Sequence, residues 1–255
     1  MRKPASAGTL QSHDRSPPGP RSRLPLLDPA CEFAVFRPRA LAGRLVVVRQ
    51  LVILGAGELA RQIAGLVEDI NQDTDTYTLV GVLDRDTDKA SADLPVLGDD
   101  DLLGRLDADY VLGVGAPDLR RKVGEKADGL GATAASLVHP LARVGRGATV
   151  GPGALLLEGT HVLYGATVGR HALVNVSSII GHDSHVGDYV TLATSATVGA
   201  RATIGDEVML GMGSIVMNDA KVGDRSVVGA GAVVTRDVPP DTCVAGVPAR
   251  PLPTR

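Results

Sequence analysis

Aliphatic residues recur with a strict period of six through the second half of the chain. Every sixth residue from Val138 to Val234 is Val, Leu or Ile, at all seventeen positions. The residue four places after each of them is usually Ala, Ser or Thr. Such a six-residue unit makes one short strand and one turn, with the aliphatic side chain inside and the small one in the corner. The pattern predicts a parallel β-helix whose coils each take three units, about 18 residues.

A different pattern precedes the repeat, in residues 45–136, which we take as a separate domain. An apolar run from Leu45 leads through a glycine turn into helical spacing, at Leu59, Ile63, Leu66 and Ile70. Two more apolar runs follow, in "YTLVGVLDRD" and "DADYVLGVGAP". Strands that alternate with helices are typical of a parallel sheet of Rossmann type. The expected architecture is therefore an α/β domain, 45–136, followed by a β-helix domain, 137–255.

Composition narrows the possible partners. The chain has no Trp and only two Phe, which suits a narrow core of small aliphatic side chains. A net charge of −3 gives no electrostatic case for nucleic acid or an anionic membrane as the main partner. Two cysteines, Cys31 and Cys243, indicate neither a disulfide scaffold nor a metal cluster.

Residues 1–44, rich in Pro and Arg and without periodicity, predict a disordered tail. We expect a cytoplasmic protein, because no signal sequence or spanning segment is evident.

Four segments carry a family resemblance: "VILGAGELARQIA", "GVLDRD", "LGVGAPDLRRKV" and "LVHPLARVG". Together with the hexapeptide repeat and the closing "VVGAGAVVTRDVPPDTCVAGVPARPL", they resemble the sialic acid O-acetyltransferase family. Its relatives include the bacillosamine-type nucleotide-sugar N-acetyltransferases. The resemblance implies a left-handed β-helix, a nucleotide-sugar-binding Rossmann-like domain, acetyl-CoA as co-substrate, and a homotrimer whose site is shared between subunits.

Two histidines and two aspartates stand close together in "GHDSHVGDY". In the period-six frame both His182 and His185 point outward, where a histidine is ordinarily surface polarity. The segment resembles the family stretch that carries the general base, which implies that role for His182 and a supporting role for Asp183. A neutral imidazole suits proton removal during attack on a thioester. A carboxylate on the other ring nitrogen fixes the tautomer.

The glycine turn at Gly55, Gly57 and Ala60 admits three interpretations: NAD binding, nucleotide-sugar binding, or plain strand–helix packing. The resemblance favours the second and implies acceptor contacts at Gly57, Glu58, Leu59, Asp84, Arg85 and Gly115. It implies acetyl-CoA contacts at Thr191, Met212 and Ala230. The chain departs from the family in two places. Glu58 and Leu59 stand where relatives often have Gly and His, and Thr191 replaces a His. The acceptor's identity is therefore open.

The basic run Arg120, Arg121 and Lys122 fits either a phosphate site or a solvated helix face. The residues 18 before and after His182 are Tyr164 and Ala200, so no histidine stacks on it and no metal is expected. The leading hypothesis is an acetyl-CoA-dependent acetyltransferase that acts directly on an amino or hydroxyl group of a nucleotide-linked sugar. A non-catalytic repeat scaffold and a metal-dependent hydratase of carbonic-anhydrase type stay open as alternatives.

Overall fold

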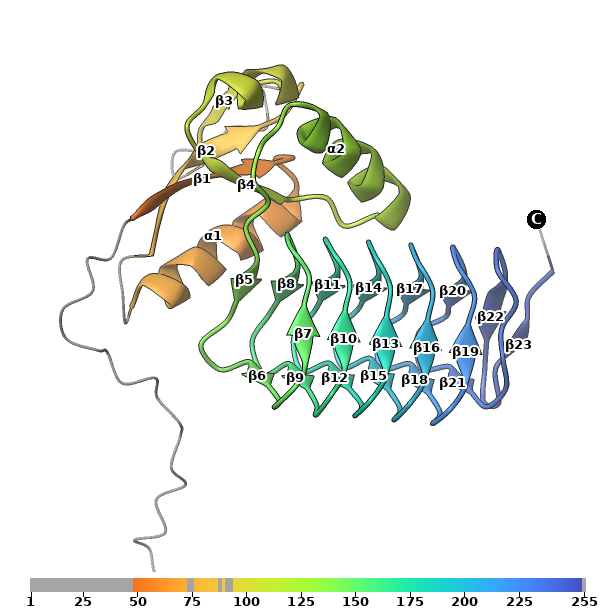
Figure 1. The fold of residues 1–255 in the computed structure, drawn as a ribbon. Coiled ribbons are helices and arrows are strands. Elements are labelled where there is room, and N and C mark those ends of the chain that lie inside the picture. The colour runs from red at the N-terminus through yellow and green to blue at the C-terminus, as the bar shows by residue number, and fades with distance from the viewer. Residues whose placement is uncertain (1–47, 73–75, 87–88, 90–93, 254–255) are drawn as a thin grey trace, which may run out of the picture. The chain divides into compact units, whose positions relative to one another are not determined.

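A computed structural model describes residues 48–253 apart from 73–75, 87–88 and 90–93 (Figure 1). The predicted tail, residues 1–44, lies outside the described residues. An α/β domain is followed by a long stack of short parallel strands, as predicted. Among the described helices, none has the length and apolar character needed to cross a membrane.

The α/β domain contains a four-stranded parallel sheet in the order β3-β2-β1-β4. Its strands are β1 (Arg49–Leu54), β2 (Tyr77–Leu83), β3 (Val96–Gly98) and β4 (Asp109–Leu112). Its helices are α1 (Glu58–Asn71), the 3-10 helix η2 (Asp100–Arg105) and α2 (Pro117–Gly129). Because β2 and β4 flank β1 on opposite sides, a topological switch point lies at the carboxyl end of β1.

Alternate residues of β1 serve two separate cores, as strand geometry requires. Leu51 and Ile53 are fully buried in the cluster that contains Ile63 of α1. Val52 and Leu54 are fully buried in the cluster that contains residues of β4 and α2. The continuous apolar run in the sequence is thus explained by a strand that is covered on both faces.

The β-helix has three faces, which we call I, II and III in chain order. Face I holds β5 (Leu137–Val138), β8 (Leu155–Leu156), β11 (Leu173–Val174), β14 (Thr191–Leu192), β17 (Met209–Leu210), β20 (Val227–Val228), β22 (Cys243–Ala245) and the antiparallel β23 (Arg250–Pro251). Face II holds β6 (Arg143–Val144), β9 (His161–Val162), β12 (Ile179–Ile180), β15 (Thr197–Val198), β18 (Ile215–Val216) and β21 (Val233–Val234). Face III holds β7 (Thr149–Val150), β10 (Thr167–Val168), β13 (His185–Val186), β16 (Thr203–Ile204) and β19 (Lys221–Val222).

The strand register confirms the predicted coil length. Thr167 pairs with His185, which is 18 residues later, and Ile179 pairs with Thr197 in the same way. Ile180, Val186 and Leu192 are fully buried, as their inward positions in the period-six frame predict. Val144 differs: it is 43% exposed, because it lies in the first coil, where no earlier coil stacks on it.

Tight corners join the three faces, and their backbone conformation determines which side chains are exposed there. Many corner residues adopt a left-handed backbone, among them Asp183 with φ of 56° and Gly165, one coil earlier, with φ of 66°. That conformation is costly for most residues and suits Gly, Asn and Asp. The corner between faces II and III therefore repeats the same backbone in successive coils and presents His182 and Asp183 outward.

Candidate active site

The two predicted catalytic side chains are hydrogen-bonded to each other at the corner between faces II and III. His182 Nδ1 donates to Asp183 Oδ2 over 2.9 Å. The two side chains are 49% and 52% exposed. Nε2 of His182 makes no hydrogen bond with any described residue. A carboxylate that holds Nδ1–H leaves Nε2 as the proton acceptor, which is the arrangement that a general base requires.

Backbone contacts to the neighbouring coils hold this pair in place. The amide of Asp183 donates to the carbonyl of Tyr164 over 2.9 Å, and the carbonyl of His182 accepts from the amide of Arg201 over 2.9 Å. A Cβ on Gly165 would lie 2.5 Å from Asp183 Oδ1. Gly165 therefore gives the carboxylate the room in which it meets the imidazole.

The other polar residues of "GHDSHVGDY" have separate partners. His185 lies on face III, where its Nδ1 hydrogen-bonds with Thr167 Oγ1 over 2.6 Å. Asp188 accepts from the amide of Arg170 over 2.8 Å. No group of three His, Cys, Asp or Glu among the described residues is placed to hold a metal ion. The sequence segment thus separates into one interacting pair and two residues that belong to the repeat.

A cavity of about 400 Å³ opens at the carboxyl ends of β1, β2 and β4, beside the switch point. Its walls come from the loops after these strands and from α2: Gly55, Leu83, Asp84, Arg85, Lys89, Asp100, Val114, Leu119, Lys122, Val123 and Lys126. Of the predicted acceptor residues, Asp84 and Arg85 line it, whereas Gly57, Glu58, Leu59 and Gly115 do not. A cavity of about 510 Å³ lies at the opposite, amino-terminal end of the sheet. We favour the switch-point cavity, because open α/β sheets bind ligands at the carboxyl ends of their strands.

Asp84 holds the glycine turn in position. Its Oδ2 accepts from the amide of Ala56 over 2.8 Å, and Lys89 Nζ lies 3.2 Å from the same oxygen. Partial burial acts to raise the pKa of Asp84, but these hydrogen bonds and one from the Asp86 amide outweigh it and keep that pKa below its usual value. The carboxylate is therefore ionised at neutral pH and already engaged with the turn.

Four cations surround this cavity, and two of them are neutralised by carboxylates. Lys89 pairs with Asp84, and Lys126 Nζ lies 2.6 Å from Asp101 Oδ1. Arg85 and Lys122 form no ion pair with any residue that the structure describes. The cavity therefore offers two cationic side chains without an ion-pair partner among the described residues, which suit a phosphate group.

Comparisons with known proteins agree with this organisation. Two family models match the chain: the PglD N-terminal domain at residues 50–127 and the bacterial transferase hexapeptide (six repeats) at residues 201–236. The acetyltransferase domain of PglB from Neisseria gonorrhoeae, solved in complex with acetyl coenzyme A, is 31% identical. That match covers 81% of this chain and 100% of that chain, with a TM-score of 0.76.

A mutant of perosamine N-acetyltransferase from Caulobacter crescentus, solved with CoA and GDP-perosamine, is 26% identical. The match covers 83% of this chain and 100% of that chain, again with a TM-score of 0.76. No curated protein matches the chain.

The chain belongs to the family of sialic acid O-acetyltransferases and bacillosamine-type nucleotide-sugar N-acetyltransferases. It is an acetyltransferase with a left-handed β-helix, as the family resemblance implied. The alternatives of a non-catalytic scaffold and a metal-dependent hydratase receive no support from these matches.

The residues predicted to contact acetyl-CoA lie in two different environments of this acetyltransferase. Met212 is 63% exposed, and Ala230 is exposed directly above it in the next coil, at the corner between faces I and II. Thr191 on face I is only 5% exposed. Its hydroxyl accepts from Arg120 Nη2 over 2.9 Å and donates to the carbonyl of Gly115 over 3.2 Å. Its contact with acetyl-CoA stays a prediction.

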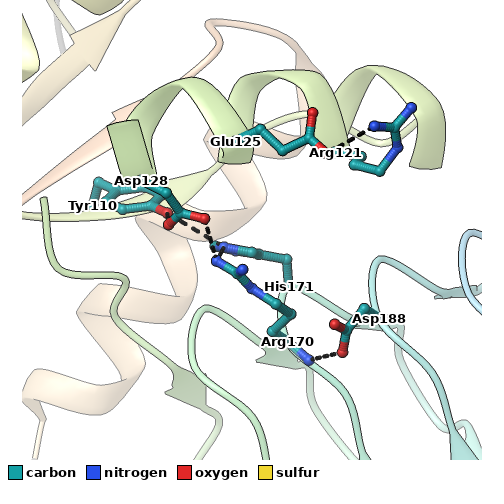
Figure 2. Close-up of polar contacts among 7 residues, drawn as sticks. All are labelled: Tyr110, Arg121, Glu125, Asp128, Arg170, His171 and Asp188. Atoms are coloured by element: carbon teal, nitrogen blue, oxygen red, sulfur yellow. Dashed lines mark hydrogen bonds and ion pairs between the residues drawn. The ribbon is translucent and has the colours of Figure 1, made fainter. Parts of the chain in front are cut away.

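The basic run at the start of α2 divides into three different environments. Arg120 is 1% exposed and makes hydrogen bonds only to neutral oxygens. Burial lowers its pKa to about 10, so it is still charged at neutral pH. Arg121 pairs with Glu125 on its own helix (Figure 2). It also pairs with Glu207 of the β-helix. Lys122 lines the cavity. No pattern in the sequence indicated that Arg120 is buried.

A buried aromatic stack lies beside Arg120, where α2 and β4 meet the β-helix. The ring of His171 stacks between Tyr110 and Tyr189, with centroid distances of 5.8 and 5.2 Å. Figure 2 shows His171 next to Arg170, which forms an ion pair with Asp128 of α2 over 2.6 Å. Burial, aided by the charge of Arg170, lowers the pKa of His171 to about 4. The imidazole is therefore neutral under physiological conditions.

Proposed function

We propose that this acetyltransferase transfers the acetyl group of acetyl-CoA to an amino group on a nucleotide-linked sugar. The carrying observation is the combination of an outward His182–Asp183 pair with a cation-lined cavity at the switch point of the α/β sheet. The relatives solved with acetyl coenzyme A and with CoA plus GDP-perosamine support the same pair of substrates. The amino group is favoured over a hydroxyl because the Caulobacter crescentus relative is named as an N-acetyltransferase.

His182 supplies the base in this proposal. Its Nε2 takes the proton from the acceptor nitrogen as that nitrogen attacks the thioester carbonyl. The new C–N bond forms, the C–S bond breaks, and the proton is available for the departing thiolate. Asp183 keeps the proton on Nδ1 and stabilises the imidazolium. Among the described residues no Ser, Thr or Cys bonds to His182, which supports direct transfer without an acyl-enzyme.

The position of the pair supports a site that is shared between copies of the chain. His182 lies at the corner between faces II and III. The described polar contacts of the α/β domain instead reach the corner between faces III and I, at Arg170, Tyr189 and Glu207, and the first coil, at His139. Exposed apolar side chains lie on face II, at Ile179 and Ile215, and at its corner with face III, at Leu163 and Met217. A homotrimer would bury them and bring one copy's His182 to another copy's cavity.

A substrate panel tests the function. Release of CoA thiol from acetyl-CoA is measured with nucleotide-linked amino sugars, with the corresponding free amino sugars, and with free sialic acids. We expect turnover with a member of the first group, because the cavity offers Arg85 and Lys122 to phosphate. Turnover with free sugars alone would contradict the proposal.

Lys122→Ala is expected to raise KM for the sugar nucleotide about tenfold with little change in kcat, because it removes one charge-assisted contact to phosphate. Lys126→Ala is the matched control, since Lys126 lies one turn further along α2 in the same cavity and is already paired with Asp101. Steady-state kinetics at saturating acetyl-CoA measures both. Equal KM values for the two variants would argue against phosphate binding by Lys122.

Asp183→Asn is expected to lower kcat about tenfold or more, because an amide no longer fixes the tautomer of His182. Asn is chosen because φ of 56° at this position would strain most other residues. Asp219→Asn is the control: Asp219 has φ of 63° at the same corner and pairs with Arg201, not with a histidine. A kcat for Asp183→Asn within twofold of the control would remove Asp183 from the mechanism.

A further inference from the structure

The corner between faces III and I presents two outward backbone carbonyls where α2 covers it. His171 and Tyr189 occupy equivalent corner positions in successive coils, with φ of 51° and 56°. Neither carbonyl accepts a backbone hydrogen bond within the described part of the β-helix. A helix packed over them without a donor would leave both oxygens buried and unsatisfied, which is unfavourable. Any docking at this corner therefore requires a donor from α2.

Arg120 supplies that donor from α2. Its Nε donates to the carbonyl of His171 over 3.0 Å. Its Nη2 donates to the carbonyl of Tyr189 over 2.6 Å and to that of Val190 over 3.0 Å. The same nitrogen reaches Thr191 Oγ1 over 2.9 Å. One edge of the guanidinium is thus bound entirely to the β-helix.

The remaining nitrogen of Arg120 bonds to the loop after β4, beside the switch-point cavity. Its Nη1 donates to the carbonyl of Val114 over 3.2 Å and to that of Gly115 over 2.7 Å. Val114 lines the cavity. Thr191 Oγ1 also donates to the carbonyl of Gly115, over 3.2 Å. Arg120 and Thr191, which are hydrogen-bonded to each other, therefore both hold the loop of residues 113–115.

We propose that Arg120 and Thr191 form a clamp that fixes the acceptor-binding loop, residues 113–115, on the β-helix, so that both are positioning residues for the acceptor. The planar guanidinium is suited to this because its donors point in fixed directions towards two partners at once. The acceptor part of this inference rests on the proposed function. It gives Thr191 a role on the acceptor side in place of a direct contact with the thioester.

The alternative explanation is that Arg120 and Thr191 only hold α2 on the β-helix. Two other contacts between α2 and the β-helix serve as controls for this alternative. Arg121 also joins α2 to the β-helix, through Glu207 at 3.0 Å, and Asp128 does so through Arg170 at 2.6 Å. Neither residue contacts the loop of residues 113–115. Loss of Arg121 therefore weakens docking without releasing the loop, whereas loss of the Arg120 or Thr191 contacts releases the loop itself.

Thr191→Val is the main test, because it removes the hydroxyl, keeps the branched shape, and leaves Arg120 its carbonyl partners. We expect KM for the sugar nucleotide to rise about fivefold to tenfold, with KM for acetyl-CoA within twofold of wild type. Arg120→Lys is expected to raise KM for the sugar nucleotide further, since one ammonium cannot reach both the corner and the loop. Arg121→Ala is expected to change neither KM by more than twofold.

Hydrogen–deuterium exchange of residues 113–118 gives a readout that needs no acceptor. We expect exchange to accelerate about tenfold in Arg120→Lys and measurably in Thr191→Val, and to stay unchanged in Arg121→Ala. Thr191→Val carries the test alone if Arg120→Lys does not fold.

Unchanged exchange in Thr191→Val, or a rise in KM for acetyl-CoA instead of the acceptor, would overturn the clamp. Accelerated exchange without turnover on any sugar nucleotide would keep the clamp and refute the proposed function.

Discussion

Replacing His182 with Ala is expected to lower kcat about a thousandfold while KM for acetyl-CoA stays within a few-fold of wild type, since removal of a general base typically costs 10²–10⁴-fold. The expectation follows from the geometry of the pair. Asp183 holds Nδ1 at 2.9 Å and leaves Nε2 facing outward as the proton acceptor. The side chain is half-exposed, so its loss leaves no cavity in the core and little change in stability.

His185→Ala is the matched control for that substitution. His185 lies three residues further along the same segment and is exposed, and its side chain hydrogen-bonds only with Thr167 among the described residues. Its loss is expected to change kcat less than threefold. Both rates are measured by thiol release with saturating substrates, and thermal unfolding confirms that each variant is folded. A kcat for His182→Ala within tenfold of wild type would refute the base assignment.

Acidification from pH 7 to pH 4 is expected to destabilise the wild-type protein by about 3 kcal/mol through His171 alone. Burial lowers the pKa of this histidine to about 4, whereas an unfolded histidine titrates near 6.5. Between these values the unfolded chain binds a proton that the folded chain does not. The stabilisation is therefore complete above pH 6.5 and is lost as the pH falls towards 4.

The cause is the surroundings of His171, which is 1% exposed between Tyr110 and Tyr189. Arg170 and Arg120 disfavour the imidazolium, and Asp128 opposes them only in part. His171→Asn removes the titrating group and tolerates φ of 51° at this position. Denaturant unfolding at pH 7, 5.5 and 4 is expected to show a weaker pH dependence in the variant. Equal pH dependence in both proteins would show that His171 is not the acid-sensitive group.

The sequence was informative wherever structure depends on a local, repeated pattern. The inward position of Ile180, the 18-residue coil, and the strand–turn–helix order around Gly55 all follow from spacing along the chain. Family resemblance added the His182–Asp183 pair, which the structure brings together through a hydrogen bond. Their catalytic roles stay predictions, as do the contacts of Met212 and Ala230 with acetyl-CoA.

What spacing could not predict depends on contacts between distant segments. Arg120 stands in a run of charges that is typical of a solvated helix face or a phosphate site. Its burial results from the β-helix corner at His171 and Tyr189, 51 and 69 residues later in the chain. Thr191 has a similar explanation, because only the docked domain shows that its hydroxyl is bonded to Gly115.

In the proposed shared site, one copy's His182 acts on an acceptor held in another copy's cavity, and hybrid oligomers distinguish this arrangement from a site within one copy. His182→Ala is co-expressed with an Arg85→Glu/Lys122→Glu variant, each carrying a different affinity tag, and mixed oligomers are isolated through both tags. Each parent alone is expected to be nearly inactive. If the site is shared, mixed trimers isolated in this way are expected to recover about a third of the wild-type rate of thiol release, because about one junction in three pairs an intact base with an intact cavity. Mixed oligomers as inactive as their parents would contradict a site shared between copies.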